Sequence, residues 1–245
     1  MRRLFLSITK GEELRFLGHL DYLRTLERAV LRAGIPVAFS EGFNPHMKLS
    51  LDSALGVGVT ADPLYLAMGL EGDMAVEKVK KNLSLQLPKG IQIHSIVEAQ
   101  DNWPKFVAVF NEDAYEMEGP VCEGFDEQLA EKALKSLELF NNLPSFLYKR
   151  VTPKKIREMD VKPMILEPMK CSFHNRRAHL TFSLVRSMTG TVQPKDIWKM
   201  LAESFDMPWI PGEFICSRTG TYRRVRGKRL TLEDPGVFDG LLKGK

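Results

Sequence analysis

The chain has 245 residues, a length that allows one large domain or two domains of ordinary size. Its 44% hydrophobic content is that of a soluble globular protein, and no apolar run is long enough to span a membrane. The net charge of +4 is uneven, because residues 1–120 carry 13 Lys and Arg against 16 Asp and Glu, whereas residues 121–245 carry 22 against 15. A basic later half favours a polyanion or an acidic partner.

The three cysteines, Cys122, Cys171 and Cys216, lie far apart and form no CxxC pair. This spacing predicts neither a disulfide framework nor a zinc site, and free thiols favour a reducing, cytoplasmic location. The N-terminus begins with two arginines but has only a very short apolar run and no small-residue cleavage site. It therefore predicts a strand rather than a signal peptide.

The first hundred residues alternate between strand and helix signals. Periodicity predicts strands at 4–9, 48–55, 64–70 and 91–97, and helices at 20–33 and 75–85. This is the β-α-β-β-α-β order of a ferredoxin-like split unit. The Asp-Asn-Trp-Pro stretch at 101–104 predicts a boundary, so residues 1–100 are expected to form the first domain.

The later residues approximate the same order with additions. We predict helices at 126–141 and 195–204, the second with Pro194 in its first turn, and strands at 106–110, 146–151, 164–174, 178–185 and 213–217. The sequence predicts a hairpin turn at Asn175, Arg176 and Arg177. The sequence therefore predicts an α+β protein with two ferredoxin-like units in tandem and antiparallel sheets, the second unit covering residues 101–245.

The helix expected from residue 20 leads into an unusually polar loop. Gly18 is placed to cap the helix, and Gly34 followed by Pro36 marks its end. The loop at 40–48, SEGFNPHMK, contains a hydroxyl, a carboxylate, an amide, an imidazole and an ammonium. It is either a surface turn or a functional loop, since functional side chains concentrate on such loops. Its candidate loop-site residues are Ser40, Phe43 and Asn44.

Four side chains in and before this loop are candidates for catalysis: His46, Lys48, Glu41 and His19. A general acid–base role for His46, with Lys48 stabilising phosphate charge, would suit RNA cleavage. Two histidines and a carboxylate can also bind a divalent metal, but their spacing matches no zinc or iron motif. His19, near a helix N-terminus, is poorly placed to carry positive charge. We therefore predict neither a metal nor a cofactor.

The stretch FLGHLDYLRTLERAVLRAGIPVAFSEGFNPHMKLS resembles the signature of the radical-SAM-linked protein family, a bacterial domain of unknown function. The family pattern is F-L-S-H-L-D-x-x-R, a helix, and then P-x-A-Y-S-E-G-F-N-P-H-P-K. The chain departs from it at Gly18, Phe39 and Met47. The family occurs alone or fused to cobalamin-binding radical SAM proteins, so the resemblance implies a radical SAM partner. The chain itself lacks the three-cysteine cluster that such an enzyme needs for its iron–sulfur centre.

Two basic segments in the second half mix Lys and Arg with Thr hydroxyls, and the later one adds a tyrosine that could stack on a base. Each is either a solvated charged loop or an RNA-binding segment, because Lys and Arg supply phosphate contacts and aromatic rings supply stacking. The candidate RNA-binding residues are Lys149, Arg150, Lys154, Lys155, Arg157, Arg218, Tyr222, Arg223, Arg224, Arg226, Lys228 and Arg229.

These observations favour an RNA-binding accessory protein that acts with a radical SAM enzyme in tRNA or rRNA modification. In this interpretation the chain is non-catalytic or co-catalytic, and whether it is an enzyme stays open. The alternatives are a metal-independent endoribonuclease that uses His46, with a tandem ferredoxin fold, and an adaptor that binds only protein. In every case we expect a cytoplasmic protein without a membrane segment.

Overall fold

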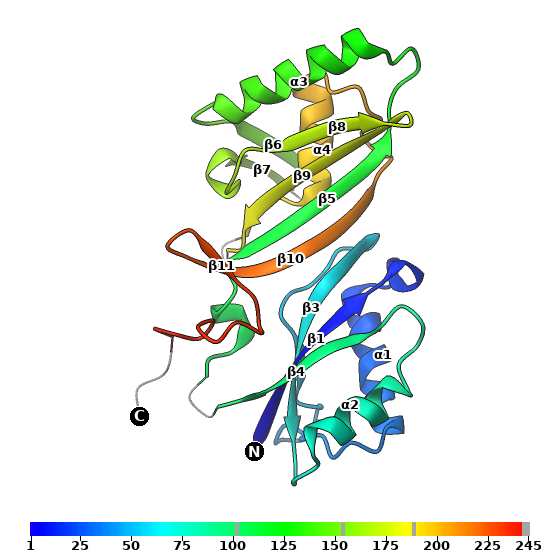
Figure 1. Cartoon of the computed structure of the whole chain (residues 1–245), viewed down its shortest axis with the longest axis vertical. Coiled ribbons are helices and arrows are strands. Elements are labelled where there is room, and N and C mark those ends of the chain that lie inside the picture. The colour runs from blue at the N-terminus through cyan, green and yellow to red at the C-terminus, as the bar shows by residue number, and fades with distance from the viewer. Residues whose placement is uncertain (101–102, 153–154, 188–189, 242–245) are drawn as a thin grey trace. The chain divides into compact units, whose positions relative to one another are not determined.

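The computed structural model describes residues 1–100, 103–152, 155–187 and 190–241, which form a mixed α/β fold with antiparallel strand pairs (Figure 1). Packing divides the chain into two compact units. Unit 1 consists of Met1–Asn111 with Gly220–Lys245, and unit 2 consists of Glu112–Thr219. The mixed helix-and-strand class predicted from the sequence is confirmed.

Unit 1 has a small antiparallel sheet with two helices. Its elements are β1 (Arg2–Lys10), α1 (His19–Arg32), β2 (Leu49–Leu51), β3 (Val59–Leu70), α2 (Val76–Ser84) and β4 (Ile93–Ala99), with short 3-10 turns at Glu12–Leu14 and Phe106–Ala108. Strand β3 pairs with β2 and β1, and β1 also pairs with β4, which gives the sheet order β2-β3-β1-β4. The element order therefore matches the predicted β-α-β-β-α-β series.

Both faces of the unit 1 sheet are covered because successive side chains of a strand point to opposite faces. On one face, Leu4 and Leu6 belong to a core that includes Leu26 of α1 and Val79 of α2. On the other, Phe5 of β1 packs with aromatic residues that follow the sheet.

The second cluster includes side chains from the C-terminal segment. Leu232, Val237 and Phe238 are buried together with Phe5 and Tyr65. These contacts place the C-terminal residues with unit 1, whereas the expected boundary placed them in a second domain at 101–245. The division into domains at 1–100 and 101–245 stays a prediction.

Unit 2 contains a second antiparallel arrangement. Its elements are β5 (Glu112–Pro120), α3 (Glu127–Asn142), β6 (Leu147–Thr152), β7 (Lys155–Asp160), a 3-10 turn (Lys162–Met164), β8 (Lys170–His174), β9 (Arg177–Val185), α4 (Pro194–Ser204) and the first part of β10 (Ile215–Val225). The main sheet has the order β10-β5-β9-β8, and β6 and β7 form a separate hairpin. Strand β10 ends in unit 1, where it pairs with β11 (Lys228–Leu230).

Three predicted strands need correction. The strand expected at 106–110 is wrong, because Phe106–Ala108 is a 3-10 turn in which Phe106 is buried, and the strand starts at Glu112. The strand expected at 164–174 starts only at Lys170, after Pro163 and Pro168, and proline lacks the N–H that a ladder needs. The strand expected at 213–217 extends to Val225.

Gly119 of β5 lies where a side chain has no room. A Cβ atom built on Gly119 would overlap the backbone carbonyl oxygen of Glu213 and lie 2.6 Å from the ring of Trp198. We therefore expect Gly119→Ala to lower the free energy of unfolding by about 1–3 kcal/mol, as overpacked substitutions do. Urea unfolding measures this, and Gly212→Ala is the matched control because its Cβ would meet nothing within 4 Å. Equal unfolding midpoints for the two variants would contradict the prediction.

Candidate nucleic-acid interface

The polar loop at 40–48 is closed by hydrogen bonds across its base. The Ser40 backbone N–H donates to the His46 carbonyl at 2.8 Å, and the His46 N–H donates to the Ser40 hydroxyl oxygen at 2.9 Å. Phe39 and Met47 form an isolated β-bridge at the same place. Ser40 therefore has a structural role, while Phe43 at the tip is fully exposed.

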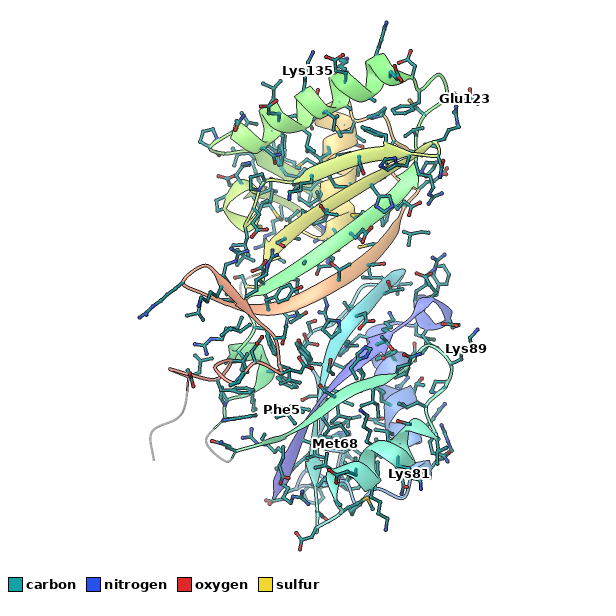
Figure 2. The ribbon with its side chains drawn as sticks, viewed as in Figure 1. Phe5, Met68, Lys81, Lys89, Glu123 and Lys135 are labelled. Carbon is teal, nitrogen blue, oxygen red and sulfur yellow. The ribbon has the colours of Figure 1, made fainter. Side chains whose placement is uncertain are left out.

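The candidate catalytic side chains do not gather around one pocket. Lys48 borders a hollow of about 430 Å³ together with Phe5 and Met68, both labelled in Figure 2. His19 borders a different, water-sized space of about 10 Å³. His46 and Glu41, both exposed, border neither of these two spaces. The two spaces therefore do not bring His46 together with Lys48 or His19.

Two buried polar side chains beside His19 were not anticipated from the sequence. The Lys10 ammonium donates to the carbonyls of Arg15 and Leu17 at 3.2 and 3.0 Å, and burial lowers the pKa of Lys10. The Tyr22 hydroxyl donates to the Thr9 carbonyl at 2.6 Å, and burial raises the pKa of Tyr22. These bonds join the end of β1 to the chain that enters α1.

The later basic segment is a β-hairpin rather than a loop. Val225 pairs with Lys228, and the turn is formed by Arg226 and Gly227, which have φ angles of 48° and 79°. Positive φ at both turn residues is typical of tight two-residue hairpins. The hairpin therefore exposes the side chains of Arg226, Lys228 and Arg229.

Tyr222 and Arg229 of this hairpin form a stacked pair. The Arg229 guanidinium lies 5.1 Å from the centre of the Tyr222 ring, within the range of a cation–π contact. Tyr222 is half-buried and Arg229 is exposed. The pair presents a flat cationic group of the kind on which bases stack.

Three other arginines of the segment are engaged by the protein itself. The Arg223 guanidinium donates to the Val237 carbonyl at 2.6 Å, and the backbone N–H of Arg224 donates to the Asn111 side-chain oxygen at 2.7 Å. Arg218 is buried, with its guanidinium 3.6 Å from Asp113. A buried guanidinium offers no surface to a phosphate, so we leave Arg218 out of the proposed RNA-binding set.

The earlier basic segment forms the β6–β7 hairpin of unit 2. Lys149 lies 3.8 Å from Glu158, and Arg150 lies 3.4 Å from Asp196. These carboxylates reduce the positive field that the two side chains present. Arg157 is exposed on β7. Lys154 lies outside the described residues, as does the side chain of Lys155.

Within the described residues, no group of three or more His, Cys, Asp and Glu side chains is arranged to hold a metal ion. None of the helices that these residues form combines the length and apolar character needed to cross a lipid bilayer.

The antiparallel sheets with their helices and the exposed basic hairpin define a mixed α/β protein with a candidate nucleic-acid surface. The chain belongs to the family described as "Uncharacterized protein conserved in bacteria (DUF2344)", whose model matches residues 3–194. Membership in a bacterial family of unknown function is thus confirmed, while a radical SAM link stays a prediction. No curated protein matches the chain.

Solved structures give distant likenesses. A chain of a Cbf5-Nop10-Gar1 complex is 8% identical with a TM-score of 0.46, and the match covers 90% of this chain and 48% of that one. The chain thus spans less than half of that protein's length. A protein of unknown function from Galdieria sulphuraria is 12% identical with a TM-score of 0.27, covering 75% and 81%. Likenesses at these scores carry no argument about function.

Proposed function

We propose that this protein is a cytoplasmic RNA-binding accessory, built from two ferredoxin-like units, that acts with a radical SAM enzyme in tRNA or rRNA modification. The observation that carries the proposal is the β10–β11 hairpin. Its exposed cations, Arg226, Lys228 and Arg229, lie next to Tyr222, over whose ring Arg229 is stacked. The hairpin thus combines phosphate-binding charge with a stacking group.

The physical basis is counterion release. Each Lys or Arg that neutralises a phosphate releases condensed cations, and this gives affinity without sequence preference. A guanidinium on an aromatic ring adds a flat surface that tolerates any base. The hairpin therefore supports binding to single-stranded or looped RNA, where bases are free to stack.

The resemblance to the radical-SAM-linked family supports the partner. Since the chain has only three separated cysteines, the radical chemistry belongs to the partner in this proposal. The loop at 40–48 is suited to docking, because its base is fixed by hydrogen bonds while Phe43 is fully exposed. Its residues Glu41, Asn44 and His46 are exposed beside Phe43.

The test compares a hairpin variant with the natural protein. Replacing Arg226, Lys228 and Arg229 together with glutamine should weaken binding to bulk tRNA, measured by fluorescence anisotropy over a range of salt concentrations. Because each lost phosphate contact removes about 0.7–0.9 from the slope of log affinity against log salt, we expect the slope to become shallower by about 2–3. Affinity at moderate salt should fall by more than about tenfold.

The control removes the same number of positive charges from α2 and the turn that follows it. Lys78, Lys81 and Lys89 are exposed in and after α2, and their replacement by glutamine should leave both affinity and slope nearly unchanged. Equal losses in the two variants would contradict a specific role of the hairpin. RNA cleavage that disappears in His46→Ala and persists with a chelator would support the endoribonuclease instead. Co-purification from cells, with identification of any iron–sulfur protein, tests the partner.

A further inference from the structure

The hollow beside Lys48 is bordered by both apolar and cationic side chains of unit 1. We propose that it binds one nucleotide, with the base against its apolar floor and the phosphate between Lys48 and Lys105. This inference rests on the proposed RNA binding, and it adds a specific subsite for one unstacked nucleotide.

The floor of the hollow suits a flat ring. Its volume of about 430 Å³ falls within the usual range for small-ligand sites. Phe5, Ala67 and Phe106 border it, and they belong to, or pack against, the aromatic cluster of unit 1. Aromatic rings pack favourably on one another by offset stacking or edge-to-face contact. The floor therefore favours a base without selecting one base strongly.

The rim of the hollow suits an anion. Lys48 and Lys105 are exposed and border it together with Arg3, whose guanidinium donates to the carbonyls of Gln100 and Trp103, both at 2.9 Å. Among the residues that the structure describes at the border of the hollow, none is Asp or Glu. Lysine binds phosphate as a point charge. The two lysines therefore favour a ligand that carries an anionic group over one that is only apolar.

Gly69 keeps one end of the hollow open. A Cβ atom built there would lie 3.1 Å from the Lys48 Cβ and 3.3 Å from the Met1 sulfur. The glycine therefore leaves room beside Lys48 that a larger residue would occupy. Ser50 also borders the hollow. It is exposed, and it pairs with Ala67 in the register of β2 and β3.

The ligand test uses AMP and UMP, with adenosine and ribose 5-phosphate as partial ligands, measured by isothermal titration calorimetry. If base and phosphate both contribute, AMP should bind at least about tenfold more tightly than either partial ligand, which corresponds to about 1.4 kcal/mol. Failure of both AMP and UMP to bind at millimolar concentration would overturn the proposal. Adenosine or ribose 5-phosphate binding as tightly as AMP would also overturn it.

Two variants locate the ligand. Ser50→Trp fills the hollow from its exposed edge and should weaken AMP binding at least about tenfold, whereas Lys48→Gln should weaken it by about three- to tenfold. The matched controls are Ser84→Trp and Lys81→Gln, at exposed positions of α2, and these should bind AMP like the natural protein. Unchanged AMP affinity in Ser50→Trp would place the nucleotide elsewhere and overturn the proposal.

The hairpin variant separates this inference from RNA binding. It should lose tRNA affinity and keep AMP affinity, because its substituted residues do not border the hollow. If AMP binding disappears in the hairpin variant and not in Ser50→Trp, the proposed nucleotide site in the hollow is wrong, while the proposed RNA binding is still supported. AMP binding without any tRNA binding would overturn the proposed function and retain the nucleotide site.

Discussion

Replacing Asp113 by alanine is expected to lower the free energy of unfolding by about 3–5 kcal/mol, the usual cost of removing one member of a buried ion pair. Asp113 accepts two hydrogen bonds from the Arg186 guanidinium, at 2.6 and 3.1 Å. Both side chains are only 12% exposed, and Arg218 adds a second guanidinium at 3.6 Å. Removal of the carboxylate takes a neutralising anion away from two cations in a poorly hydrated place. Urea unfolding followed by circular dichroism measures the loss.

An exposed ion pair provides the control for Asp113. Glu131 and Lys135 on α3 lie 2.7 Å apart, with side chains 70% exposed, and Lys135 is labelled in Figure 2. Glu131→Ala should cost no more than about 0.5 kcal/mol, because water screens such pairs. If Asp113→Ala cost no more than Glu131→Ala, the buried cluster would have no special role in stability.

Replacing Trp198 by alanine is expected to destabilise the protein by about 3–5 kcal/mol, as other buried aromatic truncations do. Trp198 of α4 is fully buried, and its ring lies 4.2 Å from that of Trp209 at an interplanar angle of 19°. Each indole N–H also donates a hydrogen bond at 3.0 Å, from Trp198 to the Ile210 carbonyl and from Trp209 to the Trp198 carbonyl. Thermal and urea unfolding measure the change.

The variant Trp198→Phe separates packing from hydrogen bonding. It keeps an aromatic ring but removes the indole donor to the Ile210 carbonyl, which still accepts from the Glu213 N–H at 3.1 Å, so its cost should be smaller than that of Trp198→Ala. A net hydrogen bond contributes about 1 kcal/mol. Equal stabilities of the natural protein and Trp198→Ala would show that the cavity collapses, contrary to the expectation.

The helices could be predicted because their signals are local. Helix α1 shows apolar spacing and ends before Gly34, whose φ of 62° suits glycine. Helix α3 begins after Asp126, whose carboxylate accepts a hydrogen bond from the Leu129 N–H at 2.8 Å, as an N-cap residue does. In both helices the residues that indicate where the helix begins or ends lie next to it in the sequence, so a short stretch of sequence is enough to predict it.

Strand β10 could not be predicted in full, because its later part lacks apolar alternation. From Arg223 to Val225 the chain is mostly cationic and reads as a loop, yet it pairs with β11. Strand formation there depends on the partner strand, and strand propensity is strongly dependent on context. Strand β6 matches the strand expected at 146–151, but β7 was not predicted, because the charged residues that follow Val151 favour a loop.

The candidate site shows the same division between local and long-range information. The sequence predicts that Lys48, the last residue of the SEGFNPHMK loop, stabilises phosphate charge, and Lys48 borders the hollow. Arg3, Ala67 and Lys105 border the same hollow but are widely separated in sequence. No local pattern indicates that they meet, because the meeting depends on strand pairing and on the burial of Phe106.

The return of the C-terminal segment to unit 1 has a consequence for synthesis on the ribosome. The aromatic cluster of unit 1 needs Leu232, Val237 and Phe238 beside Phe5, whose ring is 5.9 Å from that of Phe238. A nascent chain that has exposed only its first hundred residues therefore lacks part of the covering of its own sheet. Unit 2 is complete in sequence by Thr219, so the unit that is translated first is the last to obtain all of its residues.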